Sequence, residues 1–362
     1  MKWAWKLGRF AGIDVYVHAT FLLIVAFVAV SHWARGLGVP GVIEGVAFVL
    51  AIFACVVLHE YGHALAARRY GIRTRDITLY PIGGVARLER MPERPLQEMA
   101  VALAGPAVNV GIAALLFVWL VGSHTLRPFG ELGVATGPFL ERLLMTNLFL
   151  VAFNLVPAFP MDGGRVLRAL LALRLSYARA TEIAAGVGQA MALLFGLLGL
   201  FGNPMLLLIA LFVWIGAAQE AGMVQMRSAL AGIPVHRAML TDFRTLHPSD
   251  PLSRALDLVL STAQQDFPVV AQGAVQGVLT RADLVPALAR HPQSTPVEVV
   301  MRREVAQATP DEMLETALAR LQEPSCPVLP ITHGGVLVGM ITTENIAELV
   351  MIRTATGGRA AA

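Results

Sequence analysis

The sequence has little charge for its length. Only 15% of its 362 residues are Asp, Glu, Lys or Arg, against about a quarter in soluble domains. Apolar residues make up 56% of the chain, and the mean hydropathy is +0.63. The deficit of charge falls in residues 1–222, whereas residues 223–362 have an ordinary charge density. This distribution excludes a single soluble domain and a disordered chain, and it predicts a membrane part followed by a soluble part.

Cysteine and basic patches are also scarce. Two cysteines in the whole chain exclude a small scaffold held together by disulfides. The net charge of +3 is small, and no stretch interleaves basic with aromatic residues. We therefore expect no nucleic-acid partner.

Six apolar segments approach the length of about 20 residues that a helix needs to cross a bilayer. They are residues 15–35, 42–67, 97–122, 143–160, 181–201 and 203–219. Basic residues gather before the first segment and after the second, fourth and sixth. Because positive charge marks cytoplasmic loops, we expect a multi-pass protein of the cell membrane with both termini in the cytoplasm.

Residues 72–91 interrupt this helical pattern. Ile77, Leu79 and Tyr80 favour extended backbone, and the run from Pro81 to Gly84 favours a turn. Backbone of this kind survives near a membrane only where protein or a water-filled cavity satisfies its polar groups. The segment therefore predicts a short β-hairpin at the membrane edge.

The charged half contains an internal repeat with an offset of 62 residues. Pro248 aligns with Pro310, Gly277 with Gly339, and Thr280 with Thr342. Each unit has the pattern helix, strand, strand, helix, which is typical of two small α/β modules packed together. We expect a membrane domain over residues 1–222 and two repeats over residues 223–292 and 293–362.

One motif in the second apolar segment carries chemistry. His59, Glu60 and His63 form H-E-x-x-H, and residues four apart lie on the same face of a helix. Two imidazoles placed in this way suit zinc, with the adjacent carboxylate as general base. The alternative is a pair of packing histidines beside an unrelated glutamate. A glutamate inside a membrane segment favours the metal site, because such a group is costly there.

A catalytic zinc needs a third protein ligand, and Asp162 is the best candidate. It lies at the cytoplasmic end of the fourth apolar segment, on the same expected side of the membrane as the two histidines. Pro157, Pro160 and the pair Gly163–Gly164 indicate a backbone bent around a site. The alternative role for Asp162 is the N-cap of a helix over residues 165–173.

The H-E-x-x-H motif resembles the site-2 protease family of intramembrane zinc metalloproteases when it is combined with the segment N-x-x-P-x-x-P-x-D-G that begins at Asn154. The resemblance implies one Zn²⁺ per chain, held by His59, His63 and Asp162, with Glu60 activating water. It further implies that Asn154 stabilises the oxyanion. The expected reaction is regulated intramembrane proteolysis, in which a peptide bond in or near the transmembrane segment of a single-span membrane protein is hydrolysed.

Three other features fit the same resemblance. His18 matches the histidine of the family's first span and either gates the site or packs against it. Gly83 and Gly84 match the family's membrane-edge strand, which would pair with an unwound substrate. Asn109, in the segment G-P-x-x-N, is interpreted as satisfying a backbone group freed by the proline.

The repeats resemble CBS domains, which are appended to one subgroup of this family. The resemblance implies binding of AMP or ATP, with Thr280 and Thr342 facing phosphate and Asp283 holding the ribose. In the second repeat Asn345 replaces the acid, which weakens that site. A structural pair without a ligand, or one that forms a homodimer, is the alternative.

A CBS-regulated transporter or channel is the alternative of a different class. Transporters commonly contain duplicated or inverted halves, and residues 1–222 show no internal repeat. The fold expected is therefore a polytopic α-helical membrane protein with a membrane-edge hairpin, followed by a tandem CBS module.

Overall fold

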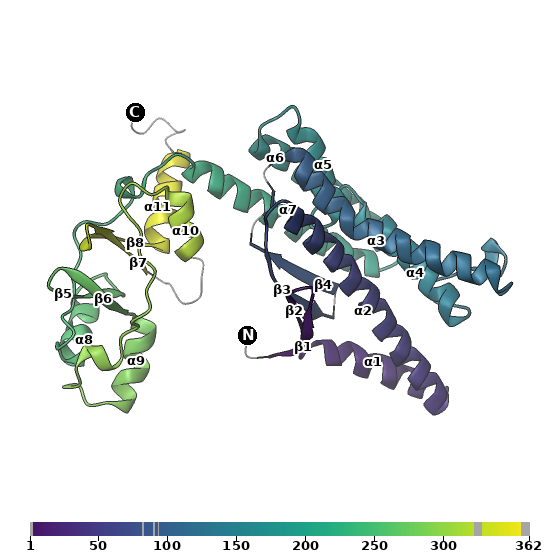
Figure 1. The fold of residues 1–362 in the computed structure, drawn as a ribbon, viewed down its shortest axis with the longest axis horizontal. Helices are drawn as coiled ribbons and strands as arrows, with labels where there is room; N and C mark the ends of the chain where they lie inside the picture. The colour runs from purple at the N-terminus through teal and green to yellow at the C-terminus, as the bar shows by residue number, and fades with distance from the viewer. Residues whose placement is uncertain (1–2, 82, 90, 93, 322–327, 356–362) are drawn as a thin grey trace. The chain divides into compact units, whose positions relative to one another are not determined.

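The computed structural model describes residues 3–81, 83–89, 91–92, 94–321 and 328–355 (Figure 1). The chain divides into two compact units, Met1–Gly222 and Met223–Ala362. Each unit is described by itself below.

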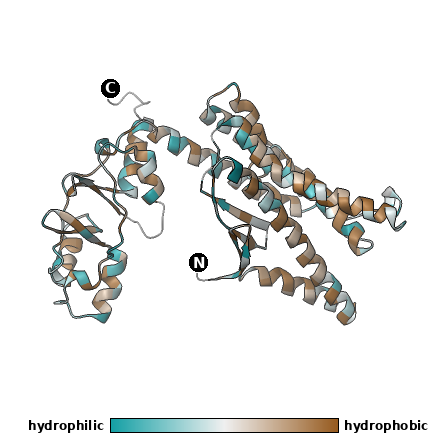
Figure 2. Ribbon diagram, viewed as in Figure 1, coloured by the Kyte–Doolittle hydropathy of each residue, from teal (hydrophilic) through white to brown (hydrophobic). Residues whose placement is uncertain are grey.

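The first unit is built mainly from helices with apolar surfaces, which are brown in Figure 2. Its α-helices are α1 (Phe21–Ala34), α2 (Gly38–Arg69), α3 (Pro95–Gly122), α4 (Phe139–Asn154), α5 (Asp162–Ala172), α6 (Tyr177–Phe201) and α7 (Met205–Leu230). Among the described residues, α2, α3, α6 and α7 are long and apolar enough to cross a membrane, and α1 is a shorter apolar helix. These helices confirm a polytopic helical membrane protein, whereas the count of six spans stays a prediction.

Two of the expected spans extend several residues beyond their helices. The first helix begins at Phe21 instead of residue 15, because Ile13–His18 forms a strand. In this strand Ile13 and Val15 are buried and alternate with more exposed residues, which is the period of a sheet. The fourth helix ends at Asn154 instead of residue 160, before Pro157. The residue before a proline disfavours helical backbone.

The hairpin expected within residues 72–91 is present and belongs to a larger sheet. Strand β3 (Thr74–Tyr80) pairs antiparallel with β4 (Gly83–Leu88). The N-terminal strands β1 (Ala4–Phe10) and β2 (Ile13–His18) extend it, and β2 pairs parallel with β3. The order is β1-β2-β3-β4, so β4 is an edge strand. The sheet packs on α2 through a buried cluster that includes Ile13, Ala64 and Ile77.

The second unit confirms the repeated order helix, strand, strand, helix. The first repeat contains α8 (Leu252–Ser261), β5 (Phe267–Ala271), β6 (Ala274–Leu279) and α9 (Arg281–Arg290). The second contains α10 (Leu314–Leu321), β7 (Val328–His333), β8 (Val336–Thr342) and α11 (Thr343–Ala355). Each repeat has its own buried apolar cluster between helices and strands.

The two repeats exchange short bridging segments. Leu240, in the part of the first repeat that precedes α8, bridges to Met340 in β8 of the second. Arg302, in the part of the second repeat that precedes α10, bridges to Val278 in β6 of the first. Backbone of each repeat is therefore bridged to a strand of the other.

A candidate metal centre on helix α2

His59 and His63 lie one turn apart on α2 and point to one place. Both are buried, with 6% of each residue exposed. Their Nε2 atoms are 3.0 Å apart. At this distance two nitrogen lone pairs repel each other unless a proton or a cation lies between them. Such an approach is expected of two ligands that share one cation.

Asp162 completes the cluster from another part of the chain. Its Oδ2 atom is 3.2 Å from Nε2 of each histidine. Asp162 is the first residue of α5, after the N-cap Met161. It is therefore not the N-cap of a helix that begins at residue 165, which was the alternative interpretation.

The two glycines after Asp162 allow this approach. A Cβ on Gly163 would collide with the carbonyl groups of Leu155 and Val156, and one on Gly164 would collide with the backbone of Ala158 and Phe159. The start of α5 is therefore in direct contact with the irregular segment that follows α4. This packing sets where Asp162 enters the cluster.

The geometry of the three ligand atoms fits zinc. Tetrahedral zinc with bonds of about 2.0 Å to nitrogen and oxygen places neighbouring ligand atoms about 3.3 Å apart. The triangle of His59, His63 and Asp162 has sides of 3.0, 3.2 and 3.2 Å. Three protein ligands leave one position of a tetrahedron open, as in catalytic rather than structural zinc sites.

Helix α3 orients both imidazoles. Nδ1 of His63 donates to the carbonyl oxygen of Val101 at 2.8 Å, and Nδ1 of His59 donates to Oδ1 of Asn109 at 2.6 Å. Because both Nδ1 atoms carry the hydrogen, both Nε2 atoms present a lone pair to a cation. The expectation that Asn109 satisfies a freed backbone group is wrong, since its side chain binds a histidine ring.

Asn147 of α4 extends this network and was not found from the sequence. Nδ2 of Asn109 donates to Oδ1 of Asn147 at 2.9 Å, and Nδ2 of Asn147 donates to the carbonyl oxygen of Leu143 at 2.8 Å. Both asparagines are fully buried. The sequence did contain a sign of this role, because Asn147 lies within an apolar segment and a buried amide needs a hydrogen-bond partner.

Glycines let α2 approach α3 closely. A Cβ on Gly105 would collide with Nε2 of His63 and would lie 2.6 Å from Nε2 of His59. One on Gly62 would lie 2.5 Å from the carbonyl oxygen of Ala104. The ligand cluster therefore occupies space that a side chain at residue 105 would fill.

Glu60 faces the sheet from the same helix. Its Oε2 atom accepts a hydrogen bond from the backbone N–H of Ala86 in β4, at 3.1 Å. A Cβ on Gly84 would lie 2.9 Å from Cγ of Glu60. The edge strand and the carboxylate beside the ligand cluster are thus in contact, and a glycine is required where they meet.

Among the described residues, His18, Asn154 and Gly83 make no hydrogen bond or ion pair with the three ligand residues. His18 ends β2, with Nδ1 2.8 Å from Oγ1 of Thr20 and its ring centroid 5.2 Å from that of Tyr80. Asn154 is the half-buried last residue of α4, and its side chain makes no hydrogen bond within the described part of the chain. Gly83 begins β4 with φ of 143°, a conformation that favours glycine.

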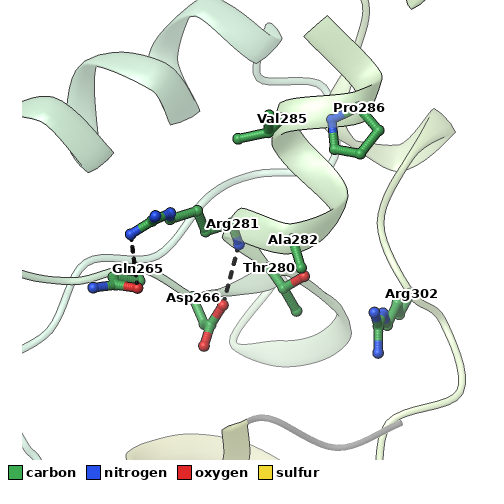
Figure 3. Close-up of a pocket in the computed structure, with 8 residues that line it drawn as sticks. All are labelled: Gln265, Asp266, Thr280, Arg281, Ala282, Val285, Pro286 and Arg302. Atoms are coloured by element: carbon green, nitrogen blue, oxygen red, sulfur yellow. Dashed lines mark hydrogen bonds between the residues drawn. The ribbon is translucent and has the colours of Figure 1, made fainter. Parts of the chain in front are cut away.

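The second unit holds a separate pocket of about 590 Å³ (Figure 3). Eight residues line it: Gln265, Asp266, Thr280, Arg281, Ala282, Val285, Pro286 and Arg302. Thr280 is among them. Burial raises the pKa of the Asp266 carboxyl.

Asp283 forms an ion pair with Arg302, one of the residues that line this pocket. Its carboxylate accepts from Nε and Nη2 of Arg302 at 2.7 and 3.0 Å and from Oγ1 of Thr280 at 2.6 Å. Partial burial opposes the charged form, but these hydrogen bonds outweigh it and hold the pKa of Asp283 below its usual range. In the second repeat Oγ1 of Thr342 donates to Oδ1 of Asn345 at 2.9 Å.

The fold and the site together define a multi-pass membrane protein with a buried His-His-Asp cluster and a C-terminal α/β pair. The family model for peptidase family M50 matches residues 47–136 and 131–195, and that for the CBS domain matches residues 235–290 and 297–352. The chain belongs to peptidase family M50, the site-2 protease family of zinc metalloproteases, and carries a CBS domain pair.

Two zinc metalloproteases align with nearly the whole chain. Zinc metalloprotease MJ0392 of Methanocaldococcus jannaschii is 31% identical, over 97% of this chain and 97% of that protein. Rip3 of Mycobacterium tuberculosis is 29% identical, over 97% of this chain and 93% of that protein. The solved structure of a site-2 protease from M. jannaschii is 36% identical and covers 60% of this chain and 95% of its own, with a TM-score of 0.45.

The close approach at Gly105 predicts the effect of a single methyl group. We expect Gly105→Ala to lower zinc affinity by at least about tenfold, the lower end of the range seen when groups that support metal ligands are changed. The loss should occur although alanine favours a helix over glycine by about 1 kcal/mol. Gly111→Ala on the same helix is the matched control, because a Cβ there meets nothing within 4 Å. Equal zinc affinity of the two variants, measured by chelator competition, would contradict the geometry.

Proposed function

We propose that this protein is an intramembrane zinc endopeptidase in which His59, His63 and Asp162 hold the metal. It would hydrolyse a peptide bond in or near the transmembrane segment of a membrane-anchored substrate. The convergence of three buried ligand atoms within 4.8 Å of one another, inside an apolar helical unit, is the observation that carries this proposal.

The residues around the ligands have distinct tasks in this mechanism. When bound, zinc supplies Lewis-acid catalysis, which activates water near neutral pH and polarises the scissile carbonyl. Glu60 accepts the proton from the attacking water and delivers it to the leaving amine. Asn154 donates from its side-chain amide to the developing oxyanion. Within the described residues the side chain of Asn154 makes no hydrogen bond, which supports that task.

The edge strand β4 is the proposed docking site for substrate. A peptide bond in a helix is shielded and hydrogen-bonded, so a transmembrane substrate must unwind before hydrolysis. An extended segment can then pair with β4 by β-augmentation, beside Gly83 and Gly84. The contact between Glu60 and Ala86 of this strand supports the assignment, because a segment paired with β4 would then lie next to the proposed general base.

We further propose that the CBS pair binds AMP or ATP and regulates the protease. The pocket lined by Thr280 and two arginines suits a phosphate group. Asp283 would hold the ribose hydroxyls, and its present partner Arg302 is the group that a ribose must displace. The homodimer expected through the CBS domains stays a prediction.

Replacing the general base separates metal binding from catalysis. We expect Glu60→Gln to keep one zinc per chain while cleavage of a co-expressed single-span membrane substrate falls by at least about 100-fold, the lower range for loss of general-base catalysis. Glu44→Gln, on the same helix but with an exposed side chain paired to Arg142, should cleave as the wild type does. Full cleavage by the Glu60 variant would rule out this mechanism.

Nucleotide binding can be measured on the full-length protein in detergent. We expect isothermal titration calorimetry with AMP and ATP to give saturable binding, and Asp283→Ala to weaken it at least about tenfold through loss of the ribose contact. Asp257→Ala, an exposed acid on α8, is the control for loss of charge. An absence of heat at millimolar nucleotide would leave the CBS pair with a structural role.

The orientation in the membrane is also testable. The basic residues that follow α2 and those that precede α1 support a cytoplasmic placement of both termini. A protease added to inverted membrane vesicles should then remove the CBS unit, whereas the same protease added to intact spheroplasts should leave it in place. The reverse pattern would invert the proposed topology.

A further inference from the structure

Arg168 of α5 is an unusual residue for the interior of an apolar helical unit. It is completely buried and is the largest of the fully buried side chains. Its guanidinium carbon lies 5.0 Å from the ring centroid of Phe159 and 4.8 Å from that of Tyr177. The side chain is therefore enclosed by aromatic rings and cannot reach water without a change in packing.

Two carboxylates from other helices bind this guanidinium. Nε and Nη2 donate to Oε1 of Glu98 on α3 at 2.7 and 2.5 Å, and Nη1 donates to Oε1 of Glu220 on α7. Glu98 is also completely buried, and its second oxygen, Oε2, has no hydrogen-bond partner among the described residues. The cluster joins α3, α5 and α7.

Stability alone is a weak explanation for such a cluster. Desolvation of buried charges can outweigh their mutual attraction, and well-packed apolar residues of similar volume are often as stable. One oxygen of Glu98 also stays without a hydrogen-bond partner among the described residues. Unlike apolar residues, the cluster can fix the orientation of α3, α5 and α7 relative to one another.

The orientation of α5 relative to α3 affects the positions of the proposed metal ligands. Arg168 follows Asp162 by six residues on the same helix, a rise of about 9 Å. Glu98 precedes Val101 by one turn of α3, and the carbonyl oxygen of Val101 accepts from His63. A short path through two rigid helices therefore connects Asp162 with His63, and the ion pair between Arg168 and Glu98 joins its two halves.

We propose that Arg168 is a positioning residue, whose ion pairs with Glu98 and Glu220 hold α5 where Asp162 can share one zinc ion with His59 and His63. The inference rests on the proposed function, because it takes these three residues as the zinc ligands. Asp162 enters from a helix of 11 residues that follows an irregular segment. Without the ion pairs, the contacts of Gly163 and Gly164 would be the remaining constraint on the orientation of α5.

The experiment compares zinc affinity with thermal unfolding for the full chain in detergent, using chelator competition and a thermal scan of the zinc-free protein. We expect Arg168→Met to lower zinc affinity 10- to 100-fold and to lower the unfolding temperature. Arg168→Lys keeps the charge but cannot bind two carboxylates in a fixed planar geometry. It should unfold closer to the wild type and still bind zinc at least about tenfold more weakly.

A triple variant distinguishes positioning from packing. Arg168→Met combined with Glu98→Leu and Glu220→Leu removes all three charges, so the unfolding temperature should return toward that of the wild type. The zinc affinity should stay low, because no ion pair directs α5. Recovery of both properties would overturn the proposal, as would unchanged zinc affinity in Arg168→Met or Arg168→Lys.

Two controls complete the design. Glu141 is a fully buried acid that pairs with Arg127 at 2.7 Å, in the same unit but away from α5. Glu141→Gln should lower the unfolding temperature and leave zinc affinity unchanged, and a loss of affinity in this variant would overturn the assignment to Arg168. Asp162→Ala tests the ligand itself: if it binds zinc as the wild type does, the proposed metal site fails, whatever the Arg168 variants show.

Discussion

One buried face of α3 holds the candidate metal centre together. Four residues along this face each contact a different part of the site. Glu98 binds the arginine of α5, Val101 and Asn109 bind the two imidazoles, and Gly105 leaves the space that the ligand atoms occupy. Because residues three or four apart lie on one side of a helix, a single rigid element can orient ligands from α2 and α5 together.

In the proposed function, the edge of the four-stranded sheet brings substrate binding and the general base to the same place. Ala86 of β4 donates its backbone N–H to Glu60, and β4 is also the strand to which a second extended chain could be added. In a membrane an unpaired strand edge is costly. The proposed function gives this edge a use, because an unwound substrate would satisfy its polar groups and lie next to the general base.

The sequence predicted those parts of the site that are encoded within a few residues. His59, Glu60 and His63 share one helical turn, and Asp162 is marked by the prolines and glycines around it. The hairpin was predicted from its turn at Pro81–Gly84. These features depend on local backbone preference, which a short segment expresses by itself.

Other parts of the structure depend on partners far away in the sequence. Residues 13–18 resemble the start of an apolar span, and the pairing with β3 makes them a strand. Asn147 and Arg168 gain their partners only when α3, α4 and α5 pack, 38 and 70 residues away along the chain. Asp283 is predicted from the sequence to hold a ribose. In the structure it pairs with Arg302, which belongs to the other repeat.

The central claim is that a zinc ion is held by two imidazoles and one carboxylate inside the apolar unit. X-ray absorption at the zinc edge of the full-length protein in detergent tests it most directly. The claim predicts one zinc per chain, with nitrogen and oxygen ligands at about 2.0–2.2 Å and two imidazole signatures. Protein that takes up no zinc would contradict it, and so would a sulfur ligand at about 2.3 Å, which would implicate the buried Cys55.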